Sequence, residues 1–529
     1  MLPRLFLTLA VSASAFGLQE SQPPTFHAAT HLVQINVVVR DRDNRPALGL
    51  TKDDFLVSDR GKPQTISVFS ADTAAPASAP SPQPPLPPNT FSNRNLESSA
   101  ARSGATIILL DNLNTLESTA SQPYESSPFW LEALALASAK RRLLEFLQQL
   151  DSADHIAIYG LSDTLHVLCD FTCTRDQLIA VVTRYDTSSK TRKEEVEPGQ
   201  FSAQVTPDPQ ADAHMDVAMQ QMASFNNERR AEVTMTALDA IAAHVADLPG
   251  RKSLLWLTAN LPFSGAAIAR ILARGSLIAY PIDARGLLPR ESGENNKEGY
   301  IDEDAYARGE LARHADYPQP VGISTMQKMA EDTGGRAFVN TNDLTGAIRS
   351  AIEDSAATYT LGFYIDASAV DDKFHEVKVQ LRRAGLTVRQ PKGYFALKDT
   401  PTVDERRRNF ARAVRSPIDS AAIPLQVTAR HGNQPGSESI ELRGTIGLAA
   451  LQLAQTSGAR KGAFDVYVVE QDAAGTPLGQ SANRLALNLT EQQYQDYLLA
   501  GVAFREAVKP LAGATTLRVL IQDEASSAV

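Results

Sequence analysis

The sequence predicts an α/β protein in which a mostly parallel, doubly wound sheet is flanked by small β regions. From residue 104 onward, apolar runs typical of buried strands alternate with helical patterns, as at 106–110, 231–248 and 253–257. On both sides of this region, short alternating runs separated by turn residues indicate antiparallel strands. A chain of 529 residues is also too long for one hydrophobic core, so several domains are expected.

The local pattern of apolar and turn residues predicts the individual strands and helices. The N-terminal strands are expected at 32–39, 55–58 and 65–69, with turn residues between them. In the α/β region we expect strands at 106–110, 155–160, 164–168, 253–257 and 277–281, and helices at 129–150, 175–185, 231–248, 266–274 and 326–333. Further strands are expected at 359–364, 374–382, 386–389, 423–431, 439–448, 463–471, 483–489 and 516–522, the second and third forming a hairpin.

Composition divides these elements into domains. The predicted segments are a signal peptide (1–17), a small β domain (26–72), a Pro/Ser/Ala-rich linker (73–103), an α/β domain (104–398) with a polar insertion (186–229), a connecting helix (399–420) and a β-rich C-terminal domain (421–529). The first β domain is too small to bury a core alone. We therefore expect it to pack on a neighbour, the C-terminal β domain.

The first residues indicate export. Arg4 precedes an apolar stretch too short to cross a bilayer, and Ala13-Ser14-Ala15 resembles a cleavage site. We expect a secreted or periplasmic mature chain without an integral membrane segment. The formal net charge of the full sequence, -10, argues against nucleic acid and favours a protein, glycan or cation as partner.

The two cysteines, Cys169 and Cys173 in LCDFTCT, lack the CxxC spacing of many metal and redox sites. Two thiols cannot hold zinc alone, whereas export permits oxidation. A local disulfide or two free thiols remain as alternatives. A turn is expected between the two residues, so they should lie close enough to pair.

Several segments in order resemble a von Willebrand factor A (VWA) domain, and more narrowly the VWA-related family of acidobacterial secreted proteins. They are ILLDNLNT, DFTCTRDQL, TALDAIAAHVADLPGRKSLLWLT, YPIDARGL, MAEDTGGRAFVNTNDL, YTLGFY and VRQPKGYFA. The resemblance covers residues 104–396 and extends to VVVRDRDNRPALGLTKDDFLVSDRGKPQTISVF. It implies a protein-binding or adhesion function.

The resemblance also implies a metal-ion-dependent adhesion site, of which this chain keeps only part. Asp111 and Thr115 occupy the first and last positions of the Asp-x-Ser-x-Ser loop, and Thr236 is the candidate middle-loop threonine, followed by Thr234. Leu113 replaces the middle serine, and Ala259 stands where the family has its last aspartate. Asn114 and Asn260 could supply amide oxygens instead.

Mg²⁺ prefers hard oxygen ligands, so the loss of one hydroxyl and one carboxylate predicts weak or absent binding. Asp111 is then interpreted first as a strand-end acid that caps the next segment through backbone N–H groups. His27 with His31, and Asp212 with His214 and Asp216, are interpreted as solvated surface groups.

The sequence thus predicts an exported VWA-type interaction module with a degenerate adhesion site and no required cofactor. Two alternatives stay open: an enzyme or enzyme subunit with its site in the insertion or between domains, and an inert structural envelope protein. No catalytic constellation is evident.

Overall fold

The computed structural model places several blocks of the chain. It describes residues 30–43, 45–73, 86–93, 105–115, 129–150, 156–171, 173–185, 209–246, 248, 250–259, 261, 264–286, 322–354, 357–398, 402–420, 422–432, 439–456, 458–526 and 528–529. The segment expected to be a signal peptide lies outside these residues.

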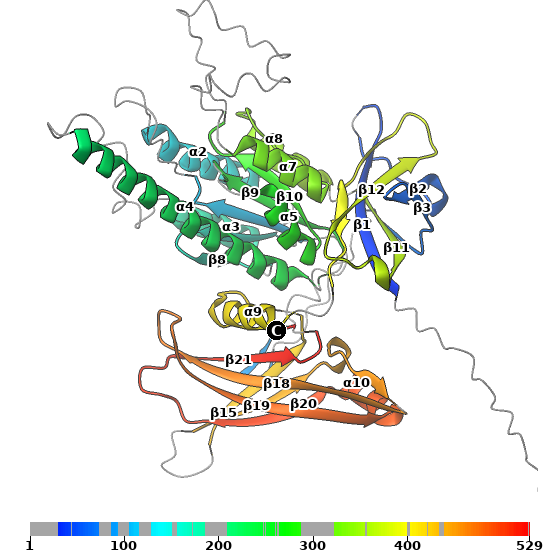
Figure 1. Ribbon diagram of the computed structural model, residues 1–529, viewed down its shortest axis with the longest axis vertical. Helices are drawn as coiled ribbons and strands as arrows, with labels where there is room; N and C mark the ends of the chain where they lie inside the picture. Colours follow the sequence, from blue (N-terminus) through cyan, green and yellow to red (C-terminus); the bar gives the residue numbers. More distant parts are fainter. Residues whose placement is uncertain are drawn as a thin grey trace, which may run out of the picture.

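A five-stranded sheet lies between two groups of helices (Figure 1). Its strands are β6 (Ala105–Asp111), β7 (Ile156–Leu161), β8 (Leu165–Cys169), β9 (Lys252–Thr258) and β10 (Leu277–Asp283), in the order β10-β9-β6-β7-β8. β6 is central and parallel to both neighbours, β10 is parallel to β9, and β8 is antiparallel to β7. A parallel bridge from Ile282 to Phe338 continues the sheet beyond β10.

Helices cover both faces of this sheet. The helices of one face are α2 (Phe129–Gln148), α3 (Arg175–Arg184) and α8 (Leu344–Glu353), and those of the other are α4 (Pro209–Val245), α5 (Gly265–Arg274) and α7 (Ile323–Thr333). Every residue of β6 is buried, with Ile107 and Leu109 facing the second group and Ile108 and Leu110 the first. An unbroken apolar run is what a strand buried on both faces requires.

Two further sheets enclose a separate core beside the helices. One has the order β13-β1-β11-β4 and the other β14-β12-β2-β3. The strands are β1 (Thr30–Arg40), β2 (Phe55–Asp59), β3 (Lys62–Gln64), β4 (Val68–Thr73), β11 (Ala357–Asp366), β12 (Phe374–Leu381), β13 (Thr387–Arg389) and β14 (Gly393–Phe395), with short 3-10 turns at Lys52–Asp54 and Ala367–Ala369. Ile35, Val37, Phe55, Tyr359 and Phe363 meet between the sheets.

This pairing corrects two expectations. The N-terminal strands do not pack on the C-terminal β domain, because β1 and β4 pair with β11 and β2 pairs with β12. Residues 357–398, expected within the α/β domain, thus complete the N-terminal β unit. The hairpin expected at 374–389 is also wrong: β12 has β2 and β14 at its edges, whereas β13 pairs with β1.

The C-terminal region is a two-sheet arrangement around its own core. The first sheet has the order β20-β16-β15-β5, and in the second β18 pairs with β17, β19 and β21. Its elements are β5 (Thr90–Ser92), β15 (Leu425–His431), β16 (Ile440–Ile446), a 3-10 turn (Leu448–Ala450), β17 (Ala454–Thr456), β18 (Ala459–Gln471), β19 (Pro477–Thr490), α10 (Glu491–Ala500), β20 (Val502–Val508) and β21 (Thr516–Asp523).

Two connections tie this region to the rest. β5 belongs to the segment expected to be only a linker, yet it pairs with β15 through Phe91 and Val427. Helix α9 (Val403–Arg415) lies between the C-terminal sheets and α4 (Figure 1). Among the described helices, none combines the length and the hydropathy needed to span a bilayer.

Candidate functional site

Asp111 lies at the carboxyl end of the central strand β6 and is fully buried. At this point the strand order reverses, since β7 lies on one side of β6 and β9 on the other. Ligands of open α/β sheets bind outside the carboxyl ends of strands at such a reversal. The position of Asp111 therefore defines the candidate site.

Protein donors occupy both oxygens of the Asp111 carboxylate. The backbone N–H of Asn114 donates to Oδ1 at 2.9 Å, the Asn114 side-chain amide donates to Oδ2 at 3.0 Å, and Trp256 Nε1 donates to Oδ2 at 2.9 Å. Burial raises the pKa of Asp111, while hydrogen bonds from Asn114, Trp256 and Thr258 oppose the rise. The bond from the Asn114 backbone is the one that a capping acid would accept.

Hydrogen bonds hold the loop after β6 together and join it to helix α4. Thr115 donates its hydroxyl hydrogen bond to the backbone carbonyl of Asp111, and the Asn114 amide donates to Thr234 Oγ1 at 2.9 Å. Asn114, Thr115 and Thr234 are fully buried. The Asn114 Oδ1 atom is buried and has no hydrogen-bond partner among the described residues.

Thr236, the first choice for the middle-loop threonine, does not join this cluster. Its side chain is exposed on α4, and Thr234 makes the contact with Asn114 instead. The reason is helical phase: Thr234 lies three and four residues before buried Ala237 and Leu238 and so shares their face. Asn260 lies outside the described residues, while Ala259 is buried.

As a metal centre the described site is poorly equipped. Mg²⁺ needs oxygens that are free to coordinate it, whereas the Asp111 oxygens face N–H donors. Leu113 packs against the apolar core at the position where the VWA motif that the loop resembles has a hydroxyl. Elsewhere in the described chain, no three His, Cys, Asp or Glu side chains lie together as a metal site. His27 falls outside the described residues, as do the side chains of the 212–216 group.

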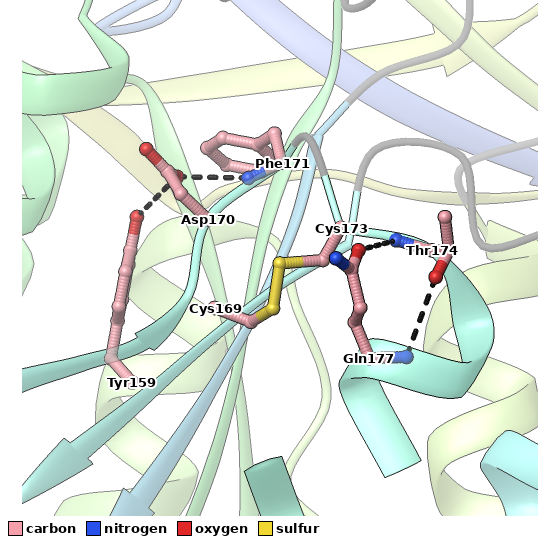
Figure 2. The surroundings of a disulfide bond; sticks show 7 residues. All are labelled: Tyr159, Cys169, Asp170, Phe171, Cys173, Thr174 and Gln177. Carbon is pink, nitrogen blue, oxygen red and sulfur yellow. Dashed lines mark hydrogen bonds between the residues drawn. A yellow bond between two sulfur atoms is a disulfide. The ribbon is translucent and has the colours of Figure 1, made fainter. Parts of the chain in front are cut away.

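Cys169 and Cys173 form a disulfide, which decides between the two alternatives left open (Figure 2). Their Cα atoms are 6.1 Å apart, within the range that a disulfide can bridge, so the expected proximity is confirmed. Thr174 and Gln177 form a capping box at the start of α3 just after this bridge. We expect no alkylation of the denatured, unreduced mature protein, and alkylation of two thiols after reduction, as measured by mass spectrometry; alkylation without reductant would contradict the bridge.

Asp170, between the two cysteines, belongs to a polar cluster that the sequence did not reveal. It accepts hydrogen bonds from the Tyr159 hydroxyl at 3.0 Å and from the Phe171 N–H at 2.9 Å (Figure 2). It also lies 3.3 Å from His244 Nε2. Nδ1 of buried His244 lies 2.5 Å from the carbonyl of Asp419, beyond α9. The cluster thus joins the sheet, α4 and the start of the C-terminal region.

Ionisation of Asp170 should make the free energy of unfolding depend on pH. Burial acts to raise its pKa, but the contacts with His244, Phe171 and Tyr159 outweigh burial and lower it. A carboxyl with a lowered folded-state pKa stabilises the protein above its unfolded pKa of about 3.9, and this contribution disappears as pH falls through the folded value. We expect Asp170→Asn to destabilise the protein at pH 6 and to lower its stability less near pH 3. Urea unfolding at both pH values measures these changes. An effect that grows on acidification would contradict this assignment.

A second missed cluster surrounds Asp354 at the end of α8. Asp354 is fully buried and contacts Arg40 Nη2 at 2.5 Å, Arg389, and the Tyr280 hydroxyl at 3.0 Å. Arg251, which is 1 % exposed, donates to the same Tyr280 hydroxyl. Arg40 and Arg389 come from β1 and β13, so these contacts join the N-terminal β unit to the α/β layers. Single arginines at the ends of strands carry no sequence signal for such a junction.

Comparisons with known proteins leave the family open. No family model matches the chain, and no curated protein matches it. A solved structure of an aerotolerance-related membrane protein from Bacteroides fragilis, carrying multiple mutations to serine, is similar at 11% identity; the match covers 48% of this chain and 98% of that one, with a TM-score of 0.26. The conserved hypothetical protein BatB from Bacteroides thetaiotaomicron gives 15% identity, the same coverages and a TM-score of 0.26.

A third solved structure, the pilus adhesin SpaC from Lactobacillus rhamnosus GG, is 8% identical. That match covers 80% of this chain and 54% of the adhesin, with a TM-score of 0.24. Similarity at this level carries no functional conclusion, which must come from the residues of this chain.

Proposed function

We propose that this chain is an exported interaction protein built on a VWA-type α/β unit, in which a hydrogen-bonded Asp111 replaces a working metal site. The observation that carries the proposal is the saturation of the Asp111 carboxylate by Asn114 and Trp256 at the carboxyl end of the sheet. A carboxylate so held fixes the loop shape without a cation. A partner would then meet a rigid protein surface and not a bridging Mg²⁺.

The strand arrangement supports the VWA-type assignment. In chain order the five strands run 3-2-1-4-5, with an antiparallel third strand at one edge and an aspartate at the end of the first. The order matches that of doubly wound sheets, in which the switch point lies beside strand 1. An interaction at this edge is also consistent with the family resemblance of ILLDNLNT.

The turn at Ser162–Thr164 gives a way to test this edge. It follows β7 directly, and the N–H of Asn112 donates to the carbonyl of Leu161 at 2.8 Å, so the turn adjoins the Asp111 loop. Thr164 is exposed. We expect Thr164→Arg to reduce capture of envelope components by the immobilised mature protein at least about threefold, because a long charged side chain disrupts a complementary surface.

Thr456→Arg, on exposed strand β17, is the matched control and should leave capture unchanged. A chelator should also leave capture unchanged, and calorimetry should detect no tight Mg²⁺ binding. Capture abolished by the chelator, with tight Mg²⁺ binding that Asp111→Ala removes, would overturn the metal-free mechanism. Equal capture by the wild type and Thr164→Arg would overturn the location.

A further inference from the structure

A cavity of about 680 Å³ lies between the C-terminal sheets and the α/β layers, away from the Asp111 site. Strands β5 and β21, which are the edges of their two sheets, both contribute to its wall. Helices α4 and α9 cover it from the α/β side. Its volume falls within the range of pockets that hold small organic molecules.

Most of the wall is aliphatic. Val427 and Ala429 of β15, Leu442 of β16, Val519 and Ile521 of β21 and Ala243 of α4 all line the space. Ala429 and Val519 are only partly buried although they belong to the edge of the C-terminal core, so apolar surface remains available inside the cavity. Burial of apolar surface at about 25 cal/mol per Å² favours an apolar occupant.

The polar groups at the α4 and α9 side of the cavity indicate the charge of the ligand. Arg274 and Arg412 both donate to the one carboxylate of Asp239, Arg274 at 3.0 Å. Among the described residues, neither guanidinium has another hydrogen-bond partner, although each carries five N–H donors. Their side chains are 41% and 32% exposed, whereas that of Asp239 is 15% exposed. Asp239 is thus the one buried anion between these two cations, and the Glu405 carboxylate adds an electrostatic contact with Arg274.

The third arginine of the wall is already occupied. Arg518 donates to the carbonyls of Ser416 and Ile418 and lies 3.3 Å from Asp419, and the chain ends beside the cavity at Val529. The donors open to a ligand are thus those of Arg274 and Arg412. Guanidinium groups pair preferentially with carboxylates.

From this geometry we infer that the cavity binds an amphipathic carboxylate, with an aliphatic chain between β5 and β21 and its carboxylate at Arg274 and Arg412. The site is separate from the Asp111 edge and does not depend on the function proposed there.

Dodecanoate, used below its micelle concentration with the full mature chain, is the probe. Calorimetry should detect saturable 1:1 binding, about tenfold weaker for dodecanol, because the charge-assisted hydrogen bonds are lost. Arg412→Gln should weaken the binding of dodecanoate about tenfold and change the binding of dodecanol little. Arg443→Gln, an exposed arginine on β16, is the matched control and should change neither.

Two further measurements locate the chain of the ligand. Ala429→Phe fills the cavity and should weaken binding about tenfold, whereas Ala503→Phe, on the exposed face of β20, should not. A diazirine-bearing fatty acid should label peptides of β15 and β21, which keeps the location testable even if Ala429→Phe fails to fold. No binding of dodecanoate, equal binding of dodecanol, or labelling confined to other elements would each overturn the inference.

Discussion

Replacing Asp354 by alanine is expected to lower the free energy of unfolding by about 3–5 kcal/mol, since removing one partner leaves buried charge uncompensated. Asp354 is fully buried and is the carboxylate on which Arg40 and Arg389 converge, while Tyr280 and Arg251 extend the contacts. Without it, the guanidinium groups lose their counter-charge at the junction between two layers.

Urea unfolding of the purified mature chain measures this change. Asp43→Ala, at a carboxylate that is 72% exposed, is the matched control and should alter the free energy by no more than about 0.5 kcal/mol. Equal effects of the two substitutions would show that the Asp354 contacts contribute little to stability.

The second large effect is expected at Asp111. Asp111→Ala removes the acceptor of Trp256 Nε1, of the Asn114 backbone N–H and of the Asn114 amide. Each buried donor left without a partner costs about 1–3 kcal/mol, so a loss of about 2–4 kcal/mol is expected after local relaxation. Trp256→Phe should cost less, because it removes one donor and leaves the carboxylate its other bonds.

Fluorescence-monitored unfolding distinguishes these variants, with Asp163→Ala, in the exposed turn after β7, as a control near the wild type. Partner capture by Asp111→Ala at a temperature where it stays folded should fall less than capture by Thr164→Arg. Loss of capture with unchanged stability would assign Asp111 to ligand binding and contradict its structural role.

The strands of the central sheet could be predicted from the sequence because the pattern that indicates each strand lies within that strand's own residues. The run Ala105–Asp111 is apolar on both faces and ends in an acid, and these facts are sufficient to expect a buried strand with a polar group at its end. The placement of Thr234 could also have been found, since Ala237 and Leu238 set the buried face of α4 one turn later. Thr236 matched the family spacing but not the helical phase.

The partners of β1 and β12 could not be found in this way. Alternation in β12 shows that one face is buried, yet it does not say which strand lies alongside. The same limit applies to Arg40 and Arg389, whose convergence on Asp354 depends on how separate layers meet. Pairing between remote segments is a property of the assembled layers and not of any window of sequence.

The pairing of β1 with β11 also determines when the chain can finish folding. Asn36 and Thr360 are hydrogen-bonded across 324 residues, and the whole α/β region lies between them. Closing so long a loop costs entropy that is lower once the intervening chain is compact. The α/β layers should therefore form early, before the N-terminal strands pair with their partners. During that interval, strands such as LVQINVVV are most exposed to aggregation and to chaperones.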